Sequence, residues 1–255
     1  MAIKQTKKLN DSSVTDVTTV NSTDRILMRD SNGKLIPISL ANLKAALSGG
    51  ISENAQVDGV FIMYHDNSGN TVRAVKPHKW PSLQSAGQIA DGVLVVEGGK
   101  LLVVAPTDDA MTWSSEAVSG GGVTTSDRLT ALNDWAGKQN TAAQITKAAC
   151  SSNAYAPGYC ANYSRVNANG QGLTAGKWWL PSLGEMLMIY ANMTKINYAL
   201  SLISGASQLQ ESAYWTSTEY SAANAWLLHL SNGAAFSLTK ASNTLRVRPV
   251  SAFIA

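Results

Sequence analysis

Charged residues are scarce in this chain of 255 residues, since Asp, Glu, Lys and Arg together make up 15% of it, against about 25% in an average globular protein. The net charge is only +3. Nucleic-acid binding normally requires a clustered basic face, so we expect no nucleic-acid partner. Apolar residues reach 45%, which is enough for a sizeable core. The surface must therefore rely on Ser, Thr, Asn and Gly.

Long hydrophobic runs are also missing. No stretch approaches the roughly 18 apolar residues that mark a membrane-spanning helix. The first residues, MAIKQTKKLNDSS, lack the apolar core of a secretory signal. We therefore expect no membrane insertion, and synthesis in a cytoplasm.

Cysteine and histidine are too few for a disulfide framework or a metal site. The two cysteines, Cys150 and Cys160, are either buried core thiols or a single bridged pair. The three histidines, His65, His78 and His229, show no metal-ligand spacing. We expect neither a metal nor a cofactor.

Catalytic motifs are not evident either, since nothing matches G-x-S-x-G or H-E-x-x-H. Glu185, Glu211 and Glu219 could in principle supply an acid/base pair, but helix capping explains Glu185 better. The glycine-rich stretch 119–122 lacks the Lys-Ser/Thr of a phosphate-binding loop and resembles a linker. We predict a protein without catalytic residues.

The charge distribution indicates three modules, because residues 1–50 and 118–255 carry a basic excess and residues 51–117 an acidic one. In the first module, two apolar runs flank the Asn-Gly turn at 32–33, which predicts a hairpin. Leu40, Leu43 and Leu47 then predict a short helix. Such a unit buries too little apolar surface to stand alone, so we expect a docking or oligomerisation segment; the alternative is a small subdomain packed on its own chain.

The second module, residues 51–117, predicts two further hairpins, 59–64 with 71–75 and 92–96 with 101–104. Their nearly continuous apolar runs are typical of strands that are covered on both faces or packed against another subunit. We expect this region to form a β-rich shaft or interface.

The third module, residues 118–255, places helices before strands. Thr141 to Gln144 resembles a capping box that opens a helix, and Ser182 to Glu185 is a stronger one. From residue 214 onward the pattern becomes strand-like. This succession predicts an α+β fold.

Alternation along the predicted strand 225–230 directs Trp226, Leu228 and Leu230 inward. Leu227 and His229 would then face outward. A binding role is one explanation for them; the other is that scattered surface hydrophobes are normal.

An ordered series of motifs in the third module resembles the C-type-lectin-like domain of bacterial and phage surface adhesins, whose fold is distantly shared with formylglycine-generating enzymes. The resemblance begins near residue 90 and rests on Asp134-Trp-Ala-Gly-Lys-Gln-Asn-Thr141, Lys177-Trp-Trp-Leu-Pro-Ser-Leu-Gly-Glu185, Ile196-Asn-Tyr-Ala-Leu200, Tyr214-Trp-Thr-Ser-Thr-Glu-Tyr220, Asn224-Ala-Trp226, Ser231-Asn-Gly233 and Arg246-Val-Arg-Pro-Val-Ser-Ala-Phe253. Residues 11–47 are similar to the first segment of phage tail-fibre and receptor-binding proteins. The tripeptides with which calcium-dependent lectins hold sugars are absent, as are the late paired cysteines of the formylglycine-generating enzymes.

The resemblance implies a variable region of the kind altered by diversity-generating retroelements, in which a constant scaffold displays interchangeable residues. The scaffold positions would be Trp215, Ser217, Glu219, Trp226, Gly233, Phe236, Val247, Arg248 and Pro249. The candidate receptor contacts would be Ala223, Leu227, His229, Ala234, Ala235, Ser237, Thr239, Ala241, Ser242, Thr244 and Leu245.

These patterns together predict a non-enzymatic receptor-binding protein of a phage tail fibre or tail tip, made in the host cytoplasm and carried on the virion. Its partners would be a bacterial surface receptor, either glycan or protein, and other tail proteins bound through residues 1–50. By analogy with fibres of this type, and because the apolar hairpins need cover, we expect a homotrimer. The alternatives are a bacterial cell-surface adhesin with the same head, a tail-tip glycan depolymerase, and a purely structural tail component.

Overall fold

The computed structural model describes residues 25–29, 35–39 and 58–252, and the chain divides into two compact units, residues 1–49 and 50–255. In the first unit, β1 (Arg25–Arg29) and β2 (Leu35–Ser39) form an antiparallel hairpin. This confirms the hairpin expected around the Asn-Gly turn. The helix expected over residues 40–47 lies outside the described residues.

In the second unit, a six-stranded antiparallel sheet contains both hairpins expected in the second module. Its strand order is β10-β15-β6-β5-β3-β4. The strands are β3 (Gly59–His65), β4 (Val72–Val75), β5 (Ala90–Glu97), β6 (Lys100–Val104), β10 (Trp178–Trp179) and β15 (Val250–Ser251).

Both faces of the middle strands of this sheet are covered by the chain itself. Val93 and Val95 of β5 pack into one core cluster, and Leu94 and Val96 pack into another. This explains the continuous apolar runs. The strands do not need a second subunit to cover them, so this argument for a trimer no longer applies to the described strands.

The second sheet has five strands in the order β13-β12-β11-β14-β7. They are β7 (Asp109–Met111), β11 (Ala213–Glu219), β12 (Asn224–His229), β13 (Ala234–Thr239) and β14 (Leu245–Val247). Neighbours are antiparallel except β11 and β14, which pair in parallel. β13 therefore forms one edge of this sheet.

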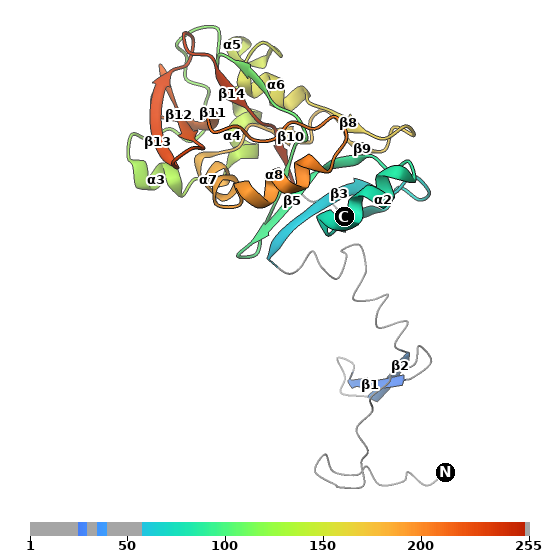
Figure 1. Ribbon diagram of the computed structural model, residues 1–255. Helices are drawn as coiled ribbons and strands as arrows, with labels where there is room; N and C mark the ends of the chain where they lie inside the picture. The colour runs from blue at the N-terminus through green and yellow to red at the C-terminus, as the bar shows by residue number, and fades with distance from the viewer. Residues whose placement is uncertain (1–24, 30–34, 40–57, 253–255) are drawn as a thin grey trace, which may run out of the picture. The chain divides into compact units, whose positions relative to one another are not determined.

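Helices α7 and α8 lie between the two sheets (Figure 1), and the largest core cluster joins their apolar side chains to those of both sheets. The opposite face of the five-stranded sheet packs against α5 and α6. The helical segments are η1 (Pro77–Lys79), α2 (Trp80–Ser85), α3 (Arg128–Leu132), α4 (Gly137–Gln144), α5 (Ala148–Ser151), α6 (Ala156–Asn162), α7 (Leu183–Ala191) and α8 (Met193–Ser201), and a short hairpin joins β8 (Arg165–Val166) to β9 (Gly172–Leu173).

One of the two expected capping boxes is present. Ser182 caps α7: its hydroxyl accepts a hydrogen bond from the Glu185 amide, while the Glu185 carboxylate accepts one from the Ser182 amide. The other prediction is wrong, because Thr141 lies inside α4, which ends at Gln144. The Thr141 hydroxyl instead bonds the backbone of Leu180. A contact with a distant segment therefore replaces the local cap that the sequence pattern predicted for Thr141.

The chain passes from the six-stranded to the five-stranded sheet between β6 and β7, and returns between β14 and β15. These two passages are joined by a hydrogen bond from the Ala105 amide to the Pro249 carbonyl oxygen, 3.0 Å long. The boundary expected between residues 117 and 118 therefore falls inside one compact unit, whose sheets draw strands from both sides of it.

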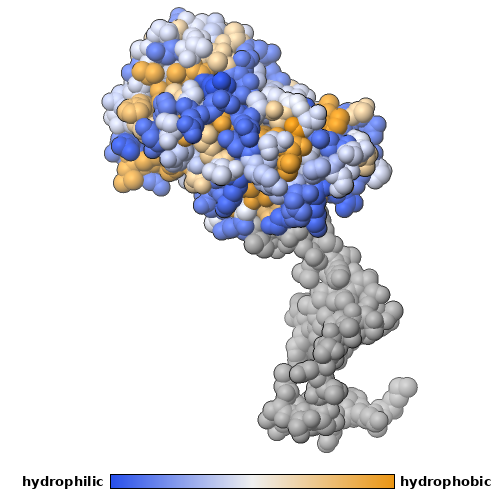
Figure 2. Space-filling view, in the orientation of Figure 1, coloured by the Kyte–Doolittle hydropathy of each residue, from blue (hydrophilic) through white to orange (hydrophobic). Residues whose placement is uncertain are grey.

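The fold is α+β, as expected from the succession of helices and strands. None of the helices in the described ranges is long and apolar enough to cross a membrane. On the face shown in Figure 2, apolar and polar side chains are interspersed in small groups.

Candidate functional site

The five-stranded sheet is built on buried tryptophans whose indole N–H groups all bond backbone oxygens. Trp215 donates to Met111 at 3.1 Å, Trp113 donates to Thr216 at 2.9 Å, and Trp226 donates to Thr125 at 2.8 Å. Buried indoles need such partners. Because each bond joins segments about a hundred residues apart in sequence, the tryptophans tie the sheet to the loops around it.

A buried ion pair anchors the loop that follows β13. The Lys240 ammonium donates to Glu219 Oε2 at 2.5 Å, to the Val118 carbonyl at 2.8 Å and to the Ala222 carbonyl at 3.0 Å. It also lies 4.4 Å from the centre of the Trp113 ring. All three ammonium hydrogens thus have acceptors. Burial lowers the pKa of Lys240, and the contact with Glu219 opposes that shift.

The same carboxylate holds the glycine-rich stretch 119–122. We expected this stretch to be a linker, and its amides are instead bonded to Glu219. Glu219 accepts hydrogen bonds from the Gly120 amide at 2.8 Å and the Gly122 amide at 3.0 Å. A Cβ on Gly120 would lie 2.6 Å from Gln144 Cγ and 2.9 Å from the Trp113 ring. Glycine is present here because the backbone must approach buried side chains closely.

Leu227, expected on the outer face, is buried with 2% exposure, and that prediction is wrong. β12 is an inner strand, and both of its faces are covered. Trp226 and Leu228 pack towards α7 and α8, whereas Leu227 packs into the cluster of Trp113 and Trp215. Alternation shows which side chains share a face but not whether that face is covered.

The other candidate contacts divide by exposure. Ala235 is also buried, at 8%. Five are partly exposed: Ala223, His229, Ala234, Ser237 and Leu245. Four are exposed, and all lie at the end of β13 or in the following loop: Thr239, Ala241, Ser242 and Thr244.

Two exposed apolar residues of this surface were not among the candidates. Phe236, expected to belong to the scaffold, is 56% exposed, and Leu238 is 38% exposed. Phe236 lies opposite Leu227 in the ladder, and Leu238 lies opposite Ala225. Phe236 and Leu238 therefore lie on the same face of the sheet as Leu227 and Ala225. Leu227 and Ala225 are buried, whereas Phe236 and Leu238 are exposed. Their alternation in sequence indicates a shared face, but only the strand order reveals that β13 is an edge.

We define the β13 surface as β13 together with the 240–245 loop. Within the described residues, β13 pairs only with β12, and this register runs without a break from Asn224 opposite Thr239 to His229 opposite Ala234. Between residues 231 and 245 the only charged residue is Lys240, whose side chain is buried. Natural edge strands usually carry charges, prolines or bulges that prevent pairing with other chains. The β13 surface has none of these within the strand.

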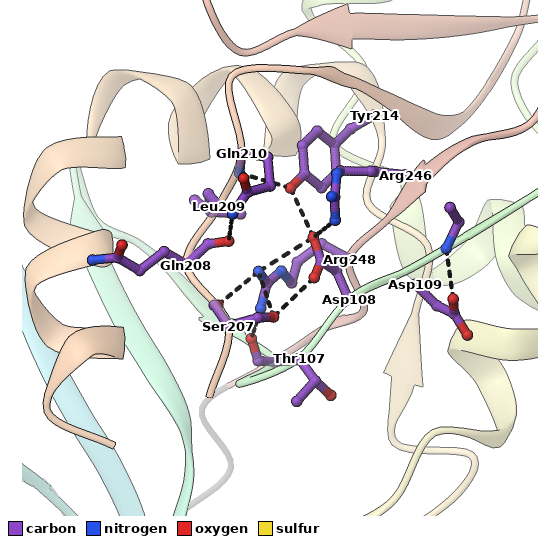
Figure 3. A network of polar contacts seen from close by, with 12 residues as sticks. Thr107, Asp108, Asp109, Ser207, Gln208, Leu209, Gln210, Tyr214, Arg246 and Arg248 are labelled. Atoms are coloured by element: carbon purple, nitrogen blue, oxygen red, sulfur yellow. Dashed lines mark hydrogen bonds and ion pairs between the residues drawn. The ribbon is translucent and has the colours of Figure 1, made fainter. Parts of the chain in front are cut away.

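A second polar network joins the two passages between the sheets (Figure 3). Asp108 accepts hydrogen bonds from the Ser207 and Tyr214 hydroxyls at 2.8 Å each and from Arg246 at 3.2 Å, and Arg248 lies 3.5 Å away. Arg248 also donates to the Ala105 and Ser207 carbonyls. Burial raises the pKa of Tyr214 to about 12 and lowers that of Arg248. The network links the two passages between the sheets, and none of its residues belongs to the β13 surface.

Cys150 and Cys160 are free and buried, which decides between the two possibilities left open above. Burial raises the pKa of the Cys150 thiol to about 11 and that of Cys160 well above its usual value. Both pack beside Trp215 as core residues. In the described ranges no group of three or more His, Cys, Asp or Glu side chains is placed to hold a metal ion.

Comparison with solved structures finds a crystal structure of a fimbrial protein from Bacteroides ovatus ATCC 8483, which is 15% identical to this chain, with a TM-score of 0.39. The aligned region covers 92% of this chain and 49% of the fimbrial protein, so the chain spans about half the length of that structure. No curated protein matches the sequence.

The sequence matches the family model of the Lcl C-terminal domain over residues 107–251. The matched region begins next to Asp108, includes the whole five-stranded sheet and ends at the last residue of β15. It is more than half of the chain. The protein therefore belongs to the Lcl C-terminal domain family.

Proposed function

We propose that this protein is a non-enzymatic receptor-binding protein of a phage tail, which attaches the virion to a bacterial surface receptor through the β13 surface. One observation carries the proposal. Within residues 213–251, the scaffold residues Trp215, Glu219, Trp226 and Arg248 are buried, whereas most of the β13 surface is exposed or partly exposed and carries no exposed charge. Among the described residues, the outer edge of β13 has no pairing strand. Such a surface can be altered residue by residue without loss of the fold.

The proposal includes a C-type-lectin-like head whose displayed positions vary. Supporting this, Trp215, Glu219 and Arg248 are fully buried, as constant positions should be. Thr239, Ala241, Ser242 and Thr244 are exposed, as variable positions should be. Leu227 and Ala235 are removed from the set of contacts, and Phe236 and Leu238 are added to it.

Several heads on one virion would convert weak contacts into useful avidity by effective concentration. A homotrimer docked to the tail through residues 1–50 is the arrangement we propose, on the resemblance of those residues to tail-fibre segments. Apart from Phe236 and Leu238, the exposed side chains of the β13 surface are small and uncharged, which favours a modest affinity at each site.

Host adsorption tests the proposal. We expect Phe236→Ser to reduce binding of the purified protein to host cells at least tenfold, because an exposed aromatic at an interface is a frequent energetic hot spot. Tyr198→Ser on α8 is the matched control, since Tyr198 is 53% exposed and lies outside the β13 surface. Equal binding by the wild-type protein and Phe236→Ser would contradict the proposal.

A glycan-release assay and the neighbouring DNA separate the alternatives. Release of oligosaccharide when the protein is incubated with host capsular glycan would replace the binding role with a depolymerase. Neighbouring DNA that encodes a reverse transcriptase and a near-copy of the 3′ end, differing only at adenines, would support diversification. Secretion genes in place of phage structural genes would favour a bacterial adhesin.

A further inference from the structure

Two adjoining cavities lie between the tip of the β5–β6 hairpin, Trp135 and α7. Their volumes are about 350 and about 200 Å³, and Lys100, Trp135 and Met188 line both. None of the lining residues belongs to the 213–251 segment that forms the proposed receptor site. Gly98 and Gly99 make the hairpin turn, with φ of 55° and 78°, so this tip can lie over α7.

The walls of the larger cavity are mainly apolar and come from α7. Leu187, Met188 and Ala191 form one side, and the Trp135 ring, which is 38% exposed, forms another. The hairpin tip is held in place because the Asn192 amide donates to Glu97 Oε2 at 2.6 Å. The result is a preformed pocket with an aromatic wall and carboxylates near it, and not a flat surface.

The aromatic wall already carries a cation. The Lys100 ammonium lies 4.1 Å from the centre of the Trp135 ring, within the distance at which a cation is attracted to the face of an indole. Lys100 is exposed and its long side chain is flexible, so its ammonium can move away from the ring. The protein's own lysine thus occupies the position that a ligand cation would take.

The smaller cavity contains a carboxylate with an unused oxygen. Glu185 is 6% exposed, and its hydrogen bonds from the Ser182 amide and the Trp179 indole are both made to Oε2. Within the described residues, Oε1 accepts no hydrogen bond. Oε1 is not among the buried polar atoms that lack a partner, so it is open to solvent and can face the positive charge of a ligand.

From these contacts we propose that the cavity binds a small organic ammonium ion, with its cationic head on Trp135 in place of Lys100 and facing the carboxylates of Glu97 and Glu185. The apolar side of α7 suits N-methyl or short alkyl groups. Displacement of Lys100 leaves the ring of Trp135 with a free face for the ligand. This binding is independent of the receptor role of the β13 surface.

Choline is the probe, and the full-length protein labelled with ¹⁵N reports binding. The indole N–H signal of Trp135, assigned by its absence from Trp135→Leu, should shift saturably as choline is added. The neutral analogue 3,3-dimethylbutan-1-ol has the same shape without the charge, and we expect it to bind at least tenfold more weakly. Lys100→Ala should bind choline at least threefold more tightly, because the competing ammonium is gone.

Two variants complete the test. Glu185→Gln keeps a side chain able to cap α7 and should weaken choline binding at least fivefold at pH 8, where the wild-type carboxyl group, with its pKa of about 7, is ionised. Lys76→Ala removes the lysine that lies 4.3 Å from the Phe61 ring elsewhere in the molecule, and it should bind choline as the wild-type protein does.

Vesicles of phosphatidylcholine form a second arm of the experiment. Sedimentation of the protein with the vesicles would identify a lipid head group as the source of the ammonium, and binding of free choline alone would identify a soluble one.

The proposal is overturned if neither choline nor the vesicles bind to the wild-type protein or to Lys100→Ala. It is also overturned if the neutral analogue binds as tightly as choline, because the pocket would then recognise only apolar shape. Tighter choline binding by Lys76→Ala than by Lys100→Ala would equally contradict it.

Discussion

Lys240 shows how one buried side chain can fix the position of a loop whose neighbouring residues are exposed. It stands between two exposed residues, Thr239 and Ala241, yet its ammonium is fully enclosed by Glu219, two carbonyl oxygens and Trp113. The neighbours of Lys240 are therefore free to change while the loop keeps its position.

Replacement of Lys240 by Met should leave the Glu219 carboxylate buried without a counter-charge. We expect a loss of roughly 3–5 kcal/mol in the free energy of unfolding, measured by urea denaturation. Lys195→Met, at an exposed position of α8, should change it by less than about 0.5 kcal/mol. If both variants lost the same small amount, the ion pair would not be the anchor described here.

Glu185 should make stability depend on pH. Burial, with a smaller contribution from Asp134, raises its pKa to about 7 from 4.5. The folded protein thus binds a proton that the unfolded chain has already released, so stability should fall as pH rises from about 4.5 to about 7 and the fall should level off above.

Glu185→Gln tests this dependence, because the amide does not titrate. Urea unfolding at pH 5 and pH 8 should show a fall of roughly 1–3 kcal/mol in the wild-type protein that is smaller in the variant. Parallel pH profiles for the two proteins would refute it.

Strands β12 and β13 lie side by side but differ in their environment, because one is an inner strand and the other an edge. Cross-strand partners make this difference measurable. Leu227 is 2% exposed, and Phe236, directly opposite it, is 56% exposed.

Leu227→Ala should cost roughly 2–5 kcal/mol of stability, because it opens a cavity beside Trp215. Phe236→Ala should cost less than about 1 kcal/mol and should affect receptor binding instead. Thermal denaturation combined with host adsorption measures both effects. If Leu227→Ala weakened adsorption without loss of stability, and Phe236→Ala lost stability without weaker adsorption, Leu227 would be the surface residue and this assignment would be wrong.

The second compact unit is held together where the chain crosses between its two sheets. Asp108 is the shared acceptor of this crossing, with a side chain 3% exposed, and Arg248 beside it is fully buried. Arg246, on the same carboxylate, is 36% exposed. The matched family region begins at this crossing and returns through it.

Asp108→Asn should destabilise the molecule by roughly 3–5 kcal/mol, because a buried guanidinium loses its counter-charge. Arg246→Ala should cost less than about 1 kcal/mol, since it removes a partly exposed partner. Chemical denaturation of the two variants under the same conditions makes the comparison. Equal losses would show that the crossing does not depend on burial of the pair.

Local signals in the sequence were sufficient wherever neighbours along the chain decide the structure. The pairing of β1 with β2, the glycine turn between β5 and β6 and the Ser182–Glu185 cap were all predicted correctly. In each case a backbone conformation or a hydrogen bond involves residues at most a few positions apart. The ordered motifs of residues 134–253 likewise indicated the family.

Exposure was decided by contacts between distant segments, which periodicity does not encode. Leu227 and Phe236 are both apolar residues in alternating strands, and only the order of the sheet makes one an inner residue and the other an edge residue. The same holds for the 119–122 stretch, whose composition is that of a linker until Glu219, about a hundred residues later, bonds its amides. The cavity beside Trp135 also arises only when the β5–β6 tip meets α7, because burial is a property of the packed chain and not of a segment.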